Sequence, residues 1–408
     1  MKILLVHNSY QLPGGEDVVY QRERDLLTAH GDEVVEYWRT NAEIDEYSAW
    51  ERFALPPRTV WSGKTRRDFA NVLRESKPDV VHVHNTFMVI SPSIYSACRE
   101  EGVPVVQTLH NYRLLCPQGS FFRNGKPCHD CASHLGHSVL HACYRGSRSA
   151  TATVALMTAW HRAVGTYSNL VDRYIALTEF SRSNFVAGGF APEKITVKPN
   201  FVDPDPGERQ NDGSYALFVG RISHEKGLRT LLQAWRQLPE PIPLRLAGTG
   251  PMAAEVKAAA AELGPHVQYL GQMPLDQLMQ LMKGARFLIF PSELYENFPL
   301  TLAESYACGV PVVASELGAM KEIVKHDYTG LLFRPGDAAD LAAKVVYAWA
   351  NREPMRKLGR QARKEYETRY TAELNYRMLR NIYEGVQKKG RARSAAGTRN
   401  DDQEAVLV

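Results

Sequence analysis

Two carboxylates in the segment PSELYENFPLTLAESYACG have the residue type and spacing that say most about chemistry. Glu296 lies in a loop after the apolar run ARFLIF, and Glu304 lies in the helix expected to follow that loop. Both side chains can therefore face one crevice at the carboxyl end of a strand, where open α/β sheets bind ligands. Ionised carboxylates accept strong hydrogen bonds from hydroxyl groups. The pair suits a polyhydroxylated ligand. Most glutamates in helices are solvated, so two such residues predict a site only together with their sequence context.

Two cations precede this pair in the segment VGRISHEKGL. A predicted strand ends at Gly220, where the backbone can turn sharply, and Arg221 and Lys226 follow in the loop. Arginine can clamp a phosphate with two parallel hydrogen bonds, and lysine adds a point charge. Each cation alone would more often be a solvated loop residue, but the two together, upstream of the Glu296 loop, predict a phosphate site.

The elements that must position these residues can be predicted from the surrounding sequence. ARFLIF has the apolar character of a buried strand. Pro299 suits the first turn of the next helix, and Cys308 and Gly309 form a helix stop before the apolar run VPVVAS.

The same alternation of short β-branched runs and amphipathic stretches extends over the whole chain. The first half contains KILLVH, EVVEYW, DVVHVH, PVVQTL and RYIALT, and the second contains YALFVG, LRLAGTG, VQYLG, FLIF, VPVVAS and GLLF. This pattern predicts two successive α/β units with doubly wound parallel sheets. We place the units at 1–200 and 201–370, with a linker at 203–213 that is rich in Pro, Asp and Gly. A helix at 371–388 is expected to cross back to the first unit, and 389–408 to form a disordered tail.

Three segments of the second unit carry a resemblance to a known family. GRISHEKG, ENFPLTLAE and GVPVVASELGAMKEIVKHDYTGLLFRPGDAADLA together resemble the nucleotide-sugar domain of family 4 retaining glycosyltransferases. The resemblance implies the GT-B fold, in which two Rossmann-like domains face a central cleft. It also implies that Arg221 and Lys226 bind a diphosphate, that Glu296 faces the donor sugar and that Glu304 holds the ribose hydroxyls. The implied donor site further includes Gly220, Asn297, Phe298, Leu300 and Thr301.

One position departs from the family pattern. Pro299 stands where the family commonly has glycine, and proline has no amide hydrogen to donate. A donor contact expected from that amide must be lost or be made by Asn297 or Leu300.

The first half contains the matching candidates for the other side of the cleft. His110 ends the run PVVQTLH and resembles the family's strand-end histidine near the transferred sugar, so it joins Arg221, Lys226 and Glu296 in the implied catalytic set. His84, which ends DVVHVH, is a secondary candidate. Gly14 and Gly15 form a turn before a predicted helix, whose amides could meet a phosphate or the acceptor. A tight turn without a ligand is the alternative.

The resemblance also implies a mechanism. Transfer with retention is thought to proceed on the front face through an oxocarbenium-like state, with the leaving phosphate assisting deprotonation of the acceptor. The two cations would stabilise charge on the departing diphosphate, so we expect catalysis that requires no metal and no other cofactor.

Four of the six cysteines lie close together in a region outside the common family pattern. Cys116, Cys128, Cys131 and Cys143 follow the spacing C-x11-C-x2-C-x11-C within a predicted insertion at 113–148. Four thiolates with a central C-x2-C suit tetrahedral zinc in a structural role. Free or buried cysteines, a disulfide pair, an iron–sulfur cluster and a mixed site remain open, the last with His129, His134, His137 and His141.

Composition limits the class of protein and its partners. The 408 residues are 44% hydrophobic and 23% charged, as expected for a globular protein of about two domains. A net charge of +4 does not indicate a nucleic-acid partner. The opening MKILLVHNS is typical of a first strand rather than of a targeting signal, and no stretch approaches the length of a membrane-spanning helix. We therefore expect a cytoplasmic protein.

Residues 47–69 indicate one further contact. They mix aromatic with basic side chains, a composition suited to an anionic membrane surface, although a helix packed on its own domain is an equal alternative. Peripheral association with the inner face of the membrane is therefore a hypothesis.

The predicted function is transfer of a sugar from a nucleotide-diphosphate sugar to a glycan or lipid-linked acceptor, in cell-surface or exopolysaccharide synthesis. A sugar-nucleotide epimerase or a phosphorylase of the same architecture is the first alternative. A zinc-bearing interaction module is a more distant one.

Overall fold

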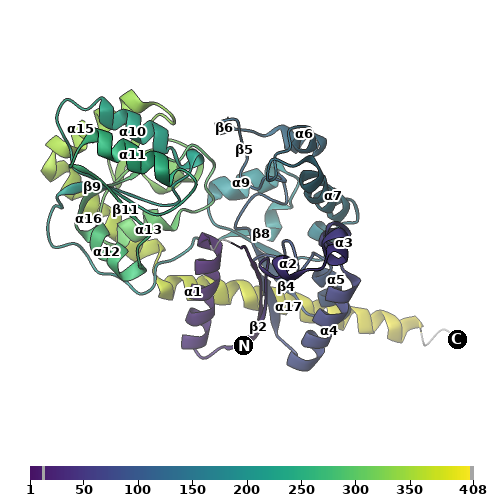
Figure 1. The fold of residues 1–408 in the computed structure, drawn as a ribbon. Coiled ribbons are helices and arrows are strands. Elements are labelled where there is room, and N and C mark those ends of the chain that lie inside the picture. The colour runs from purple at the N-terminus through teal and green to yellow at the C-terminus, as the bar shows by residue number, and fades with distance from the viewer. Residues whose placement is uncertain (12–13, 405–408) are drawn as a thin grey trace.

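Two six-stranded parallel sheets form the framework of the protein (Figure 1). The computed structural model describes residues 1–11 and 14–404, with side chains through residue 388. The N-terminal sheet has the strand order β2-β1-β3-β4-β7-β8, and the C-terminal sheet has the order β11-β10-β9-β12-β13-β14. Each sheet is wound in both directions from its first strand, which confirms the predicted α/β fold with two doubly wound units.

The strands of the N-terminal sheet coincide with the apolar runs of the first half. Their bounds are β1 (Lys2–Ser9), β2 (Glu33–Thr40), β3 (Val80–Val83), β4 (Val105–Thr108), β7 (Arg173–Ala176) and β8 (Ile195–Val197). The helices of this domain are α1 (Gly15–Ala29), α2 (Glu43–Glu46), α3 (Ala49–Val60), α4 (Gly63–Ser76), α5 (Ile94–Glu100) and α9 (Glu179–Ala187). Every residue of β3 and β4 is buried, as expected for parallel strands covered by helices on both faces.

The C-terminal domain is built in the same way. Its strands are β9 (Tyr215–Val219), β10 (Leu244–Ala247), β11 (Val267–Gly271), β12 (Ala285–Phe290), β13 (Val312–Ser315) and β14 (Gly330–Phe333). Its helices are α10 (Leu228–Arg236), α11 (Ala253–Leu263), α12 (Leu275–Lys283), α13 (Leu300–Ala307), α14 (Gly318–Ile323), α15 (Ala338–Ala350) and α16 (Arg352–Arg369). In α10 the apolar residues recur on one face, and Leu228, Leu231 and Trp235 are buried in the domain core.

The chain returns to the first domain through α17 (Ala372–Glu404), which runs beneath the N-terminal sheet in Figure 1. Leu379, Tyr383 and Val386 of this helix are buried in one cluster with Ile3 and Val106 of the N-terminal sheet. The predicted crossing is therefore confirmed. The prediction of a disordered tail at 389–408 concerns residues whose side chains, and from 405 also the backbone, lie outside the described part of the chain.

The cysteine-containing insertion follows β4. It holds the two-stranded antiparallel sheet β5 (Phe122–Arg123) and β6 (Lys126–Pro127), and the helix α6 (Gly136–Leu140). The helices α7 (Arg148–Ala163) and α8 (Thr166–Asn169) follow it. Helix α7 packs against both α6 and α3, so it joins the insertion to one side of the N-terminal domain.

The two domains meet through α9. The Glu322 carboxylate of α14 accepts hydrogen bonds from the backbone amides of Glu179 at 3.0 Å and Phe180 at 2.7 Å. An acidic side chain at a helix N-terminus is stabilised by the free amides and the helix dipole. The Thr178 hydroxyl also donates to the carbonyl oxygen of Asn297 at 3.2 Å. These contacts hold the carboxyl ends of the two sheets toward each other.

Candidate active site

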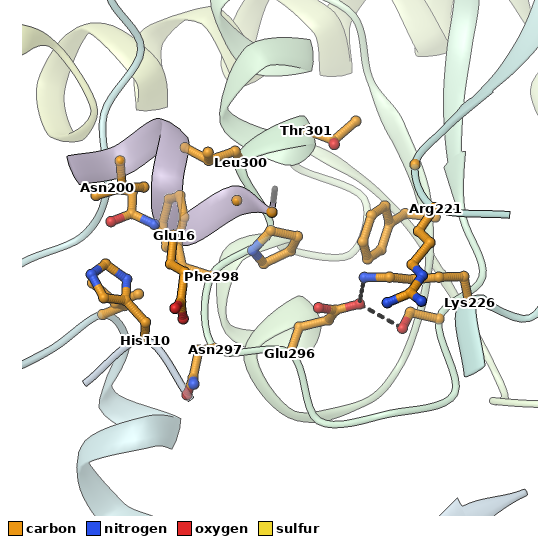
Figure 2. A pocket seen from close by; sticks show the side chains of 18 of the residues that line it. Glu16, His110, Asn200, Arg221, Lys226, Glu296, Asn297, Phe298, Leu300 and Thr301 are labelled. Atoms are coloured by element: carbon orange, nitrogen blue, oxygen red, sulfur yellow. Dashed lines mark hydrogen bonds and ion pairs between the residues drawn. The ribbon is translucent and has the colours of Figure 1, made fainter. Parts of the chain in front are cut away.

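A cavity of about 480 Å³ lies between the two domains and is lined by both (Figure 2). Its walls are formed by loops at the carboxyl ends of β1, β4, β9 and β12, which are the positions where α/β sheets bind ligands. Most of the residues predicted from the sequence line this one space: Gly14, Gly15, His110, Gly220, Arg221, Lys226, Glu296, Asn297, Phe298, Leu300 and Thr301. Glu304 is absent from this lining in the described part of the chain.

Lys226 and Glu296 form an ion pair at the C-terminal wall. The Lys226 ammonium lies 2.5 Å from Oε1 of Glu296, and the Ser292 hydroxyl donates to the same oxygen at 2.7 Å. Strands β9 and β12 are neighbours in the sheet, so the loops that carry the two charges emerge side by side. Arg221 lies beside this pair in the cavity (Figure 2).

The loop that carries Arg221 and Lys226 depends on a glycine at its end. Gly227 has φ 70°, and a Cβ atom on it would lie 2.0 Å from the carbonyl oxygen of Pro291. No other residue fits both that conformation and that approach. Gly227 therefore lets the β9 loop press against the β12 loop, which brings Lys226 to Glu296.

Glu304 has a partner from the other domain. Its Oε1 accepts a hydrogen bond at 3.0 Å from Nη2 of Arg22, a residue of α1, and both side chains are largely buried. Arg22 also donates to the carbonyl oxygen of Phe201 at 3.4 Å. The carboxylate expected to hold ribose is thus engaged in an interdomain ion pair.

Pro299 lies immediately before α13 and also lines the cavity. Its carbonyl oxygen accepts from the Leu302 amide at 3.0 Å, so it acts as the N-cap of the helix. Pro299 therefore has no amide hydrogen to donate at the start of a helix that faces the cavity. Asn297 and Leu300 line the cavity beside it.

Two buried amide side chains in the cavity wall have unpaired oxygens. Oδ1 of Asn200 and Oδ1 of Asn297 have no hydrogen-bond partner among the described residues, although both residues are more than nine-tenths buried. A buried acceptor without a donor is costly. The two oxygens are themselves shielded from the cavity, so a ligand could pair with them only after their side chains rotate.

Glu16 contributes a carboxyl group to the N-terminal wall. Its oxygens accept hydrogen bonds from Asn85 at 2.9 Å and Asn111 at 3.3 Å. Burial raises the pKa of Glu16 to about 7, against the lowering effect of Arg113. The backbone amide of Gly14 in the same turn already donates to Asp17 at 2.7 Å, so it is engaged within the protein.

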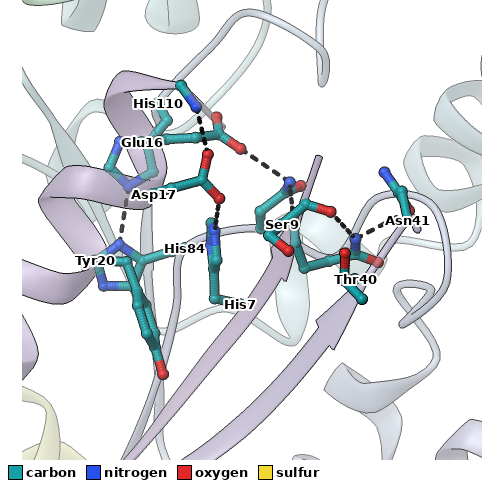
Figure 3. Close-up of polar contacts among 12 residues, drawn as sticks. His7, Ser9, Glu16, Asp17, Tyr20, Thr40, Asn41, His84 and His110 are labelled. Carbon is teal, nitrogen blue, oxygen red and sulfur yellow. Dashed lines mark hydrogen bonds and ion pairs between the residues drawn. The ribbon is translucent and has the colours of Figure 1, made fainter. Parts of the chain in front are cut away.

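His110 is coupled to the second histidine predicted from the sequence. Nε2 of His110 lies 2.9 Å from Nδ1 of His84, and the two rings are stacked (Figure 3). His84 is buried beneath His110, away from the cavity lining. Burial lowers the pKa of His110 well below its usual value, and the neighbouring His84 lowers it further.

The four clustered cysteines are free thiols in the structure. Cys116 and Cys131 are buried and their side chains interact, and Cys128 and Cys143 lie within electrostatic range of Cys131. Among the described residues, the group of metal-ligand atoms that meet within 4.8 Å is instead formed by Glu23, His82 and His84.

Several residues in or beside the candidate site were not predicted from the sequence. Ser292 lies in the quoted motif but has no distinctive spacing, and Arg22, Asn200 and Glu16 come from elements far from it. The acidic first turn of α1 was a weak signal for Glu16. Arg22 gave no signal, because its partner is contributed by another domain.

Comparisons with known proteins assign the class. A family described as Glycosyltransferase Family 4 matches residues 14–206, and one described as Glycosyl transferases group 1 matches residues 202–365. The two matches cover both domains, so the chain belongs to glycosyltransferase family 4 and has the GT-B fold.

Curated relatives are similar over part of their length. The chain is 25% identical over 294 residues to an uncharacterized glycosyltransferase of Methanocaldococcus jannaschii, covering 69% of this chain and 70% of the relative. It is 32% identical to the D-rhamnosyltransferase WbpZ of Pseudomonas aeruginosa, over 39% of this chain and 42% of that protein. It is 30% identical to the O-antigen chain mannosyltransferase B of Escherichia coli, covering 42% and 50%. The match thus covers half or less of the length of WbpZ and of the mannosyltransferase.

Solved structures share the fold. Anabaena HepE in complex with UDP superposes with a TM-score of 0.69 at 18% identity, over 95% of this chain and 100% of HepE. The sucrose-phosphate synthase of Thermosynechococcus elongatus gives the same TM-score and identity, over 94% and 98%. None of the helices within the described residues is long and apolar enough to span a membrane.

Proposed function

We propose that this protein is a retaining glycosyltransferase that moves a sugar from a nucleotide-diphosphate sugar to a glycan or lipid-linked acceptor in polysaccharide synthesis. The observation that carries the proposal is the interdomain cavity, in which Arg221 lies beside the ion pair of Lys226 and Glu296 on the C-terminal wall. The cations suit a diphosphate, and the carboxylate suits sugar hydroxyls.

The relatives support the choice of substrates. HepE has been crystallised with UDP and with UDP-glucose, and one relative from Escherichia coli is named an O-antigen chain mannosyltransferase. A nucleotide-sugar donor and a surface-glycan acceptor follow as the proposal for this chain.

The proposed catalytic roles follow from charge. As the bond from the sugar to the diphosphate breaks, negative charge grows on the departing phosphate, and Arg221 and Lys226 stabilise it. A preorganised donor of this kind is typically worth about 3 to 4 kcal/mol. Glu296 and His110 then hold the sugar rather than attack it, and the cations supply the charge that a divalent metal provides in other transferases. The domains enclose the reactants and exclude water.

The test is a panel of nucleotide sugars. A true donor should raise the unfolding temperature, since a ligand at a hundredfold excess over its Kd stabilises by about 2.7 kcal/mol. With the donor found, transfer to an acceptor should retain the anomeric configuration and persist in EDTA. Inversion of configuration, or free sugar phosphate as the product, would contradict the proposal.

We also propose that the insertion binds a structural zinc ion through Cys116, Cys128, Cys131 and Cys143. The four thiols are unoxidised and gathered in one insertion, and four protein ligands leave no open position for catalysis. The purified protein should contain one equivalent of zinc, which Cys131→Ser should release while Cys308→Ser does not. Protein that is folded and free of zinc, with all four thiols reactive, would rule the site out.

We further propose that the N-terminal domain contacts an anionic membrane. Trp50 and Phe53 of α3 are 73% and 75% exposed, and Leu156 and Trp160 of the adjacent α7 are also exposed. The α3 segment also carries basic residues, among them Arg52. Cosedimentation with phosphatidylglycerol vesicles should be lost in Trp50→Ser/Phe53→Ser but kept in the C-terminal control Leu275→Ser. Equal loss in both, or binding to neutral vesicles alone, would contradict this.

A further inference from the structure

A chain of buried polar side chains leads from the interior of the N-terminal domain to His110. Lys198, just after β8, lies 2.6 Å from Oε1 of Glu23 in α1. The other oxygen of Glu23 lies 3.3 Å from Nε2 of His84, and Nδ1 of His84 lies 2.9 Å from Nε2 of His110. Lys198, Glu23 and His84 are at most 3% exposed. Figure 3 shows the last link, where the chain reaches the cavity.

Lys198 fixes the charge at the inner end of this chain. Its ammonium is held between Glu23 and Oδ1 of Asn375, which is 2.9 Å away in α17. Burial alone would raise the pKa of Glu23, but Lys198, with His84 and His82, lowers it well below its usual value. Glu23 is therefore an ionised carboxylate, which can only accept hydrogen bonds.

The cluster is not arranged for a metal ion, although Glu23, His82 and His84 lie within ligand distance of one another. Both ring nitrogens of His82 are already engaged, Nδ1 by the Tyr383 hydroxyl at 2.7 Å and Nε2 by the Thr108 hydroxyl at 2.8 Å. The positive charge beside Glu23 is already supplied by Lys198. The ion pair thus takes the place of a metal centre.

The ionised carboxylate determines where each proton of the chain resides. Nε2 of His84 lies 3.3 Å from Oε2 of Glu23, and neither atom has a hydrogen-bond partner elsewhere or a well-aligned bond to the other among the described residues. A carboxylate oxygen at this distance can only accept, so it favours a hydrogen on this nitrogen. A neutral His84 then has a bare Nδ1, which accepts from Nε2–H of His110. His110 is left with its lone pair on Nδ1, the nitrogen that no described side chain occupies.

We propose that Glu23 and His84 are positioning residues that hold His110 as the Nε2–H tautomer, so that its Nδ1 accepts a hydrogen bond from a substrate hydroxyl in the cleft. That this hydroxyl belongs to a carbohydrate rests on the proposed function, whereas the assignment of the tautomer does not. His110 acts as an acceptor and not as a proton-removing base, because a second cation would sit in a buried cluster whose nearest carboxylate is already paired with Lys198.

The direct test is histidine nitrogen NMR on the full-length protein, without substrate. In ¹⁵N-histidine-labelled protein the His110 signals are assigned by their loss in His110→Gln. The expected spectrum shows a protonated Nε2 and an unprotonated Nδ1 for His110, unchanged across neutral pH. A protonated Nδ1, or rapid exchange between both tautomers, would overturn the proposal even if the protein is an active transferase.

A pair of variants tests the role of Glu23. Glu23→Gln presents an amide that either tautomer of His84 can satisfy, so His110 should populate both tautomers, and kcat/KM should fall by about 10-fold to 100-fold, as for other outer residues that orient a functional histidine. Tyr383→Phe removes an equally buried hydrogen bond from His82 and should leave the His110 tautomer unchanged. The same spectrum in Glu23→Gln as in wild type would show that Glu23 does not set the tautomer. If the tautomers behave as expected and no nucleotide sugar is a substrate, only the proposed function fails.

Discussion

The two walls of the cleft hold their charges in opposite ways. On the C-terminal wall, Lys226 and Glu296 are paired at the cavity surface, with side chains 21% and 12% exposed. Behind the N-terminal wall, in the interior of the domain, Lys198 and Glu23 are paired out of contact with solvent, with both side chains 0% exposed. Each pair joins a residue that follows a strand to a residue of a neighbouring segment. The two pairs differ in whether a ligand can reach them.

The difference indicates a division of roles. Two charges paired at the cavity can separate and bind the phosphate and hydroxyl groups of a ligand, since water can solvate each charge while the pair is broken. A fully buried pair cannot, because removal of one member leaves an uncompensated charge in the interior. The C-terminal wall is therefore suited to binding and reaction, and the N-terminal pair to holding other residues in place.

The largest effect that separates the walls should come from Lys198→Met. It leaves Glu23 buried and unpaired, which typically costs about 3 to 5 kcal/mol of stability. Urea unfolding monitored at pH 7 measures the change. The double variant Glu23→Leu/Lys198→Met should recover most of the loss, since replacement of a buried pair by apolar residues is often neutral. A loss in Lys198→Met no larger than that in the double variant would mean that the pair is not a fixed structural element.

Lys226→Ala should do the reverse of Lys198→Met, lowering activity strongly and stability little. Loss of one preorganised charge at the leaving group is expected to lower kcat by about 10²-fold to 10³-fold, while stability changes by at most about 1 kcal/mol because the pair is partly exposed. Lys257→Ala, an exposed lysine of α11, is the control and should change neither. Turnover at the wild-type rate in Lys226→Ala, with lowered stability, would erase the distinction between the walls.

A third experiment concerns the ion pair that bridges the walls, Arg22 with Glu304. Glu304→Gln removes the charge proposed to accept the ribose hydroxyls, and a hydrogen bond to a charged group contributes about 1.5 to 3 kcal/mol, so the KM for the donor should rise by about 10-fold to 100-fold. Arg22→Ala leaves the carboxylate in place and should raise the KM less. A larger increase in Arg22→Ala would show that Arg22, not Glu304, contacts the nucleotide.

The two walls also differ in how far they could be predicted from the sequence. Arg221, Lys226 and Glu296 come from two short segments, each directly after a buried strand. Parallel strands end at the same edge of a sheet, so both segments were expected at one edge. The resemblance to a known family placed them in one site, although 70 residues separate Lys226 from Glu296 along the chain. The strands of both sheets were predicted from short β-branched runs that alternate with amphipathic stretches, the pattern of a doubly wound parallel sheet.

The N-terminal network could not be assembled in this way. Glu23, His84, His110 and Lys198 lie on four elements, and Asn375 reaches them from the helix that crosses back. Lys198 stands in the ordinary segment KITVKPN, where nothing distinguishes a fully buried lysine from a surface one. Its partner is defined only once β8 and α1 are packed together. The same holds for Arg22, whose partner carboxylate, that of Glu304, lies in the other domain.

The smallest expected effect tests Glu16, a carboxyl group on the N-terminal wall that faces the cavity without a lysine beside it. Burial raises its pKa to about 7 in the folded protein, whereas the pKa of a glutamate in the unfolded chain is about 4.5. Between these values the folded state binds more protons than the unfolded state, so stability falls as pH rises through this window. The contribution is fully present below about pH 4.5 and is lost above about pH 7.

Glu16→Gln keeps the hydrogen-bonding shape and cannot ionise, so it should remove this part of the pH dependence. The measurement is the unfolding temperature of both proteins from pH 5 to pH 8 at constant ionic strength. The wild type should lose stability relative to the variant as pH rises, by less than Lys198→Met costs, because Glu16 borders the cavity and is only partly buried. A constant difference between the two curves would mean that Glu16 is already ionised at pH 5. The carboxyl would then belong with Glu296, as a solvated charge ready for a ligand, and the contrast between the walls would rest on Glu23 alone.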